Sequence, residues 1–163
     1  MDIRKTTSED LPALLTIFQA ARAYMTLHGN PHQWVNRPAA DDIERDIAAG
    51  VSYVCIENGE IAGTFAYIPG PDPTYATIYD GAWPDEAPYG VIHRLAGSAG
   101  SHGVAAAAFR FALEQCDHLR IDTHQDNRIM QDLLRKHGFS FCGTILLADG
   151  DPRWAYFKRK TDE

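Results

Sequence analysis

The chain has 163 residues, of which 45% are hydrophobic and 23% are charged, and its formal net charge is -7 at pH 7. These values are ordinary for a globular protein, and we expect one domain over residues 1–163. The acidic balance argues against a nucleic-acid partner, because phosphate contacts need clustered Lys and Arg. It is compatible with a basic, amine-bearing substrate.

The cysteines indicate a reducing compartment. Cys55, Cys116 and Cys142 have no paired spacing, so we expect buried thiols in a cytoplasmic protein. The first residues do not resemble a signal peptide, and no apolar run reaches the length of a membrane span. We therefore expect no membrane partner, and a homodimer is left open.

Turn signals and hydrophobic periodicity divide the chain into strands and helices. Thr7 or Ser8 caps a helix with an amphipathic pattern, and Asn58-Gly59 between two apolar runs predicts a hairpin. The proline-rich segment 69–88 predicts a long functional loop with a short strand near 74–79. The expected strands are 3–5, 51–57, 61–68, 89–96, 118–124, 139–147 and 153–158, and the expected helices are 8–27, 38–49, 101–116 and 127–137.

This order predicts a mixed sheet covered by helices. The hairpins are antiparallel. The strand–helix–strand piece over residues 89–124 forms a parallel, right-handed crossover.

Residues 97–105 form a glycine-rich turn between an expected strand and an expected helix. The first N–H groups of a helix have no partner within it, and the helix dipole favours negative charge there. Small residues let a phosphate approach the backbone closely. We therefore predict a phosphate site, with these candidate residues: Gly100, Ser101, His102, Gly103, Val104 and Ala105.

The element order and this turn resemble the GNAT superfamily of N-acetyltransferases over residues 3–158. The superfamily's pyrophosphate pattern, Gln/Arg-x-x-Gly-x-Gly/Ala, falls on residues 100–105, with Gly103 and Ala105 at the small positions. Gly100 replaces the usual Gln or Arg, so phosphate contacts would come from backbone N–H groups, with Ser101 and His102 as further donors. The resemblance implies an α/β (α+β) fold. It would have a mixed, mostly antiparallel sheet of about six or seven strands with about four helices, splayed between strands 4 and 5.

The resemblance also implies acetyl-CoA as co-substrate, no metal, and direct transfer to an amine in a ternary complex. The fourth strand would offer its backbone at Leu95, Ala96 and Gly97 to the pantetheine arm and the acetyl carbonyl, and these residues are equally suited to a core. Asn127 would contact pantetheine. Leu134 stands where many members have a tyrosine acid, so that role is not carried over.

The amine must lose a proton before it attacks the thioester. His93 is the best candidate base by residue type, since histidine titrates near neutral pH, and Tyr89 is the next candidate, as base through water or as acid. Alternation along the strand would place both on the same face as Leu95. A histidine hydrogen-bonded within the sheet is the alternative.

Other reactive side chains have simpler explanations. Asp122 and His124 share a strand face, and we favour a structural clamp there over catalysis, with Asp126 as a helix cap. His32 lies near a second histidine, but nothing suggests a third ligand, so no metal is expected. Cys142 has no partners typical of a nucleophile.

Aromatic and acidic residues mark the expected amine site. Rings suit a cationic amine through cation–π contacts, and carboxylates pair with its charge. The alternative is that the aromatics pack the loop onto the sheet. The candidates are Trp34, Asp72, Tyr75, Asp80 and Trp83.

The leading hypothesis is transfer of acetyl from acetyl-CoA to a primary amine of a small molecule or peptide. A non-catalytic acyl-CoA-binding or sensing module is the alternative, motivated by Gly100 and Leu134. A dinucleotide-binding oxidoreductase is disfavoured, because the turn lacks Gly-x-Gly-x-x-Gly and follows an antiparallel hairpin.

Overall fold

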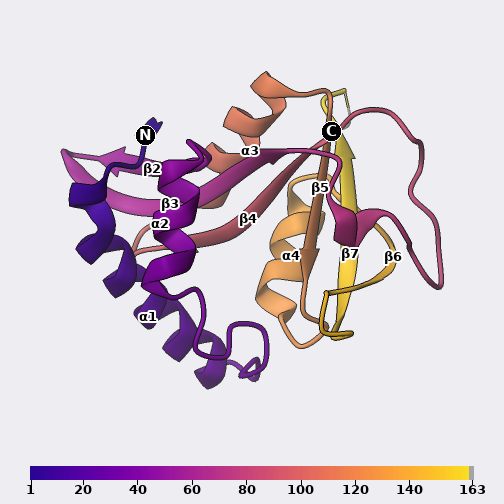
Figure 1. The fold of residues 1–163 in the computed structure, drawn as a ribbon, viewed down its shortest axis with the longest axis horizontal. Coiled ribbons are helices and arrows are strands. Elements are labelled where there is room, and N and C mark those ends of the chain that lie inside the picture. Colours follow the sequence, from indigo (N-terminus) through magenta and orange to yellow (C-terminus); the bar gives the residue numbers. More distant parts are fainter. Residues whose placement is uncertain (162–163) are drawn as a thin grey trace. The chain divides into compact units, whose positions relative to one another are not determined.

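The computed structural model describes residues 1–161, which form a seven-stranded sheet and four α-helices (Figure 1). The strand order is β1-β2-β3-β4-β5-β7-β6. The pairs β1–β2, β2–β3, β5–β7 and β6–β7 are antiparallel, and β4–β5 is parallel, which confirms the predicted mixed sheet. The strands are β1 (Asp2–Lys5), β2 (Ser52–Glu57), β3 (Glu60–Pro69), β4 (Gly90–Gly97), β5 (His118–Thr123), β6 (Ser140–Leu146) and β7 (Pro152–Arg159); the helices are α1 (Leu11–Leu27), α2 (Ala40–Ala48), α3 (Val104–Gln115) and α4 (Arg128–Lys136).

The chain forms two compact units. Unit 1 comprises Met1–Ile68 and Ile92–Phe111, and unit 2 comprises Pro69–Val91 and Ala112–Glu163. Both β4 and α3 contribute residues to each unit. The expectation of a single domain stays a prediction from the sequence. Among residues 1–161, no helix combines the length and apolar character needed to cross a bilayer.

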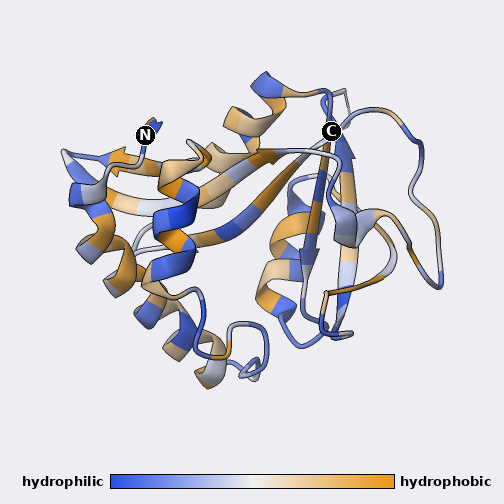
Figure 2. Ribbon diagram, in the orientation of Figure 1, coloured by the Kyte–Doolittle hydropathy of each residue, from blue (hydrophilic) through white to orange (hydrophobic). Residues whose placement is uncertain are grey.

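The core of unit 1 lies where α1 and α2 meet β2 and the end of β4. Figure 2 shows hydrophobic and hydrophilic residues interspersed along both helices, as expected for helices with one buried face. The Asn58-Gly59 turn adopts φ values of +52° and +79°, the left-handed conformation that the predicted β2–β3 hairpin needs. The core residues are Leu14, Ile17, Phe18, Ile43, Val54 and Ala96.

A short 3-10 turn, Ser8–Asp10, precedes α1, and Thr7 is its cap, as predicted. The carboxylate of Asp10 accepts the Thr7 backbone N–H at 2.8 Å and pairs with both terminal nitrogens of Arg4 at 2.8 and 3.0 Å. The hydrogen bonds from Arg4 are the main reason that the pKa of Asp10 falls to about 2.

We expect the stabilising effect of the Asp10 carboxylate to disappear in acid. A carboxylate with a lowered folded-state pKa stabilises the protein above its unfolded pKa, of about 3.9, and that contribution is lost as the pH falls through the folded value of about 2. Urea unfolding of the protein and of its Asp10→Asn variant should therefore differ most at neutral pH and converge in acid. A difference that stays constant over this range would contradict the assignment.

Unit 2 is built on β5, β7 and β6, with the first two residues of β4 alongside. Gly90 pairs with Leu119 and Val91 with Arg120, and the parallel ladder ends there. This short ladder matches the predicted splay between strands 4 and 5. The core of the unit is formed by Tyr75, Val91, Ile145 and Ala155.

The loop between β3 and β4 contains a 3-10 turn, Pro73–Tyr75, where a short strand was expected. The Asp72 carboxylate accepts both the backbone N–H and the hydroxyl of Thr74, at 2.9 and 2.7 Å, and this capping favours the turn over an extended chain. Only Tyr79 makes a β-bridge, to Thr144.

Gly81 brings this loop into direct contact with β6. A Cβ at Gly81 would lie 1.9 Å from the carbonyl oxygen of Cys142, which accepts the N–H of Ala82 at 3.0 Å. We expect Gly81→Ala to lower the free energy of unfolding by about 1–3 kcal/mol, because the loop must move off β6. Urea unfolding measures the change. Gly150→Ala measures the strain of a left-handed φ, +87°, with no heavy atom within 4 Å of the added Cβ. A loss in Gly81→Ala below about 0.5 kcal/mol would contradict the close approach at Gly81.

Candidate active site

The predicted phosphate turn lies wholly in unit 1, between β4 and α3. α3 begins at Val104, later than predicted, because Gly103 has a φ of +85° and the Ser101 N–H donates to Ser98 O at 3.0 Å. Gly100 is also left-handed, at +76°, and an added Cβ at either glycine would have no heavy atom within 4 Å. The Ser101 hydroxyl donates to Ser98 O at 2.7 Å, so its oxygen can only accept from a further group.

This turn leaves open space in front of the first turn of α3. His102 and both glycines are exposed, whereas Val104 is buried and Ala105 is half-buried. The first N–H groups of α3 have no acceptor within the helix, and the dipole adds partial positive charge. The turn can therefore hold a phosphate with backbone groups alone.

The strand before the turn is anchored at its end. Ala96 is 6% exposed and belongs to the unit 1 core, and Ser98 N–H donates to Ala62 O at 2.8 Å. Leu95 is half-buried and Gly97 is exposed. The buried Ala96 side chain and the Ser98 hydrogen bond therefore fix the position of the backbone over Leu95, Ala96 and Gly97.

β4 does not alternate regularly, which corrects the simple two-face pattern. Arg94 has a φ of +53°, in the left-handed region and outside the extended conformation of a regular strand. A left-handed residue rotates the chain after it, so His93 and Leu95 do not share a face by alternation. His93 is half-buried and has interacting neighbours in the structure.

Tyr89 belongs to unit 2, where its side chain is held on both sides. Its hydroxyl oxygen accepts the Asp72 backbone N–H at 2.8 Å. The guanidinium carbon of Arg120 lies 3.9 Å from the centre of the Tyr89 ring and 4.1 Å from that of Trp83.

Arg120 is the residue of this region that the sequence pattern does not reveal. It is 4% exposed, donates to the Asp85 carbonyl at 2.9 Å, and its Nε has no hydrogen-bond partner among the described residues. Burial lowers its pKa, and the two rings stabilise the cation. The one available signal is an arginine between Leu119 and Ile121, the two apolar residues of β5.

The amine-site candidates of unit 2 are partly engaged in packing the loop. Tyr75 is 1% exposed, and its hydroxyl donates to Asp122 at 2.6 Å; burial first, and then Asp122, raise its pKa. Trp83 donates its indole N–H to the Tyr75 carbonyl at 2.9 Å. Asp72 caps the 3-10 turn, and Asp80 is exposed.

Trp34 belongs to unit 1, whereas the other four amine-site candidates belong to unit 2. It is half-buried and lies edge-on to Phe18, with ring centres 5.5 Å apart. Within its unit it therefore contacts the core from the segment between α1 and α2.

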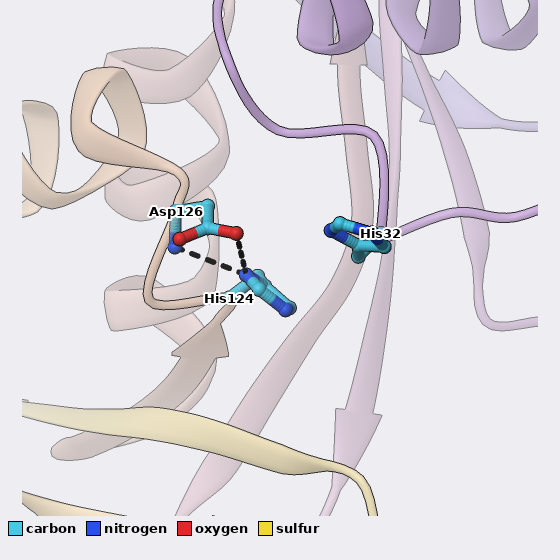
Figure 3. A group of neighbouring side chains, drawn as sticks. All are labelled: His32, His124 and Asp126. Carbon is cyan, nitrogen blue, oxygen red and sulfur yellow. Dashed lines mark hydrogen bonds and ion pairs between the residues drawn. The ribbon is translucent and has the colours of Figure 1, made fainter.

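Asn127, and not Asp126, caps α4. Its side-chain oxygen accepts the Met130 N–H at 3.1 Å, so that oxygen forms the cap. The Asp126 N–H donates to Nδ1 of His124 at 3.0 Å, and the Asp126 carboxylate lies 3.6 Å from the same atom (Figure 3). Nδ1 is thus an acceptor here, and His124 braces the start of α4 together with Gln131, which donates to its carbonyl at 3.3 Å.

Leu134 is 0% exposed, so the position of the usual tyrosine acid is filled by a core side chain. Cys142 offers no replacement. Its thiol lies 3.4 Å from the Ser140 carbonyl, and burial raises its pKa to about 11. A nucleophilic cysteine needs a lowered pKa, so Cys142 has the wrong environment for covalent catalysis.

We expect Cys55 and Cys142 to resist thiol reagents in the folded protein. Burial raises both pKa values to about 11, so little thiolate exists at about pH 8. Peptide mapping after treatment with iodoacetamide should find both unmodified until denaturant is added. Rapid native labelling of Cys142 would contradict the inferred environment.

A parallel β4–β5 pair bridged by α3, with a glycine turn at the start of α3, is the arrangement that the resemblance to acyl-CoA-dependent acetyltransferases implies. The chain belongs to the acetyltransferase (GNAT) family, whose model matches residues 16–139.

Solved structures agree with this assignment. A GNAT-family acetyltransferase from Streptococcus agalactiae is 32% identical, with 97% of this chain and 94% of that chain covered and a TM-score of 0.87. A putative acetyltransferase from Staphylococcus aureus is 26% identical, with 99% of this chain and 100% of that chain covered and a TM-score of 0.72. Arabidopsis thaliana Naa50, in complex with the bisubstrate analogue CoA-Ac-MVNAL, is 14% identical, with 96% of this chain and 97% of that chain covered and a TM-score of 0.63. At this identity the two proteins are similar in fold alone. No curated protein sequence matches the chain.

Proposed function

We propose that this protein transfers an acetyl group from acetyl-CoA to a primary amine, by direct attack in a ternary complex and without a metal. The observation that carries the proposal is the turn at Gly100 and Gly103, both left-handed and open, at the start of α3 in a chain of the GNAT family. Its backbone donors and the helix dipole suit the pyrophosphate of CoA.

The remaining cofactor contacts would come from backbone and amide groups. Leu95, Ala96 and Gly97 would offer N–H and C=O groups to the pantetheine arm and the acetyl carbonyl. The Asn127 amide can donate while its oxygen caps α4. Backbone N–H groups aimed at the thioester oxygen would stabilise the negative charge that develops there.

The transfer needs a base for the amine and a route for the leaving thiolate. His93 would accept the ammonium proton, and the amine nitrogen would then form the new bond to the acetyl carbon. As the carbon–sulfur bond breaks, the nitrogen would lose its second proton to water. Because Leu134 has no proton to give, the thiolate would leave as such and take a proton from water; a thiol pKa of about 8.5 makes this feasible. Tyr89 is the alternative acid or base.

The acceptor would be a small molecule or a peptide that carries a cationic amine. The net charge of -7 and the exposed Asp80 favour a cation. The peptide portion of the analogue bound to the plant relative is the reason to include peptides among the acceptors.

A non-catalytic acyl-CoA-binding module is the second candidate, because Gly100 and Leu134 depart from the family pattern. Calorimetric titration with acetyl-CoA, followed by a thiol-release assay over a panel of amines and peptides, tests both. Binding with release supports the transferase, and binding without release on any acceptor supports the module. Failure to bind CoA would overturn both.

A further inference from the structure

Arg94 adopts a backbone conformation that is rare for arginine. Its φ is +53° within β4, whereas the other non-glycine residues with positive φ among residues 1–161 are Asn36, Asn58 and Asp80, all in turns or bends. Asn and Asp tolerate this region because their short side chains bond locally, but a long side chain has no such compensation. Surrounding contacts must therefore hold Arg94 in place.

Asp46 on α2 supplies that contact within unit 1. Arg94 Nε donates to Asp46 Oδ2 at 2.6 Å, and Nη2 donates to Oδ1 at 2.8 Å, so the guanidinium grips both carboxylate oxygens. The two side chains are 28% and 12% exposed. Two parallel hydrogen bonds in a largely buried pair fix the orientation of the guanidinium more strictly than an exposed ion pair does.

This pair sits directly before the backbone proposed to meet the acyl group. The dihedral angles of Arg94 set the direction of the peptide groups on either side of it. Two residues later, Ala96 is fixed in the core, and Ser98 is fixed by its bond to Ala62 O. The orientation of the N–H and C=O groups between Arg94 and Ala96 thus depends on the conformation in which the pair with Asp46 keeps Arg94.

We propose that Arg94 is a positioning residue for acyl transfer. Held by Asp46, it keeps β4 in the left-handed bend that aims the following peptide groups at the acyl thioester. The inference rests on the proposed function, and Arg94 acts through the backbone without touching the acyl group. Preorganised donors are effective only when they are already aimed at the developing charge.

Three variants separate the bend from the ion pair. Arg94→Ala removes the pair and disfavours the bend. Arg94→Gly removes the pair but accepts positive φ. Asp46→Asn keeps the size of the side chain and removes its charge. The matched control is Arg37→Ala, which removes a second two-point pair on α2, between Arg37 and Asp42, with distances of 3.2 and 2.6 Å.

Two measurements are made on the unsubstituted protein and on every variant: kcat with the best acceptor, and the ratio of Kd for CoA to Kd for acetyl-CoA. We expect Arg94→Ala to lower kcat by about 10- to 100-fold and to lose any preference for acetyl-CoA over CoA, while Kd for CoA is unchanged. Arg94→Gly should retain more activity than Arg94→Ala. Adding Asp46→Asn to Arg94→Ala should cause no further loss, since both remove the same interaction.

Equal kcat values in Arg94→Ala and Arg37→Ala would overturn the inference. So would a parallel loss of kcat and CoA affinity, which would indicate a collapsed cofactor site. Should Arg94→Ala fail to fold, Asp46→Asn, which removes the charge of the same pair, is compared with Arg37→Ala in its place, and equal kcat values in those two variants would overturn the inference. Failure of the proposed function is distinguishable, because the unsubstituted protein would then release no thiol with any acceptor.

Discussion

Gly103→Asp should reduce the affinity for CoA by about 100-fold or more while the protein stays folded. The added carboxylate would stand at the start of α3, where the proposed pyrophosphate binds, and would repel it. No heavy atom lies within 4 Å of the new Cβ, so packing is preserved, although the φ of +85° adds strain. Calorimetry with CoA and acetyl-CoA measures the loss.

Two controls isolate the charge from the strain. Gly103→Ala adds the same strain without charge and should weaken binding much less. Gly59→Asp places the same residue at a φ of +79°, also with nothing within 4 Å, in the β2–β3 turn, and should leave CoA affinity intact. Unchanged affinity in Gly103→Asp would remove the turn as the cofactor site.

His93→Ala should lower kcat by about 100-fold and leave CoA affinity unchanged, as expected for loss of a general base. His93 directly precedes the left-handed Arg94, so its position depends on the same bend of β4. The measurement is the steady-state rate of thiol release with the best acceptor, together with Kd for CoA.

Free imidazole should restore part of the rate in His93→Ala, because it replaces the lost proton acceptor and not the lost packing. His28→Ala is the control, since His28 is exposed at the end of α1 and stacks on Tyr24 with ring centres 4.0 Å apart. Normal turnover in His93→Ala would transfer the role of base to Tyr89 or to water.

Local patterns predicted most of the fold. The Asn58-Gly59 turn, the Thr7 cap and the apolar periodicity of α1 each depend on neighbours within a few residues, and the structure confirms all three. The glycine turn before α3 is equally local, since it depends on Gly100, Gly103 and the start of the helix; its role in phosphate binding stays a prediction.

Long-range contacts explain what the sequence could not predict. Arg94 is left-handed, and its side chain pairs with Asp46, 48 residues earlier. The Arg120 guanidinium lies over the rings of Trp83 and Tyr89, which come from the segment before β4. Alternation along a strand contains no information on either contact, so the face assigned to His93 had to be corrected.

The distribution of tryptophans gives each unit its own optical probe. Trp34 lies in unit 1 against Phe18, whereas Trp83 and Trp154 lie in unit 2, with Trp83 against the cationic Arg120. Replacing both unit 2 indoles by phenylalanine would leave an emission that reports on unit 1 alone. Melting curves followed through that emission would then tell whether CoA, which we propose to bind at the turn in unit 1, protects that unit separately or the whole chain together.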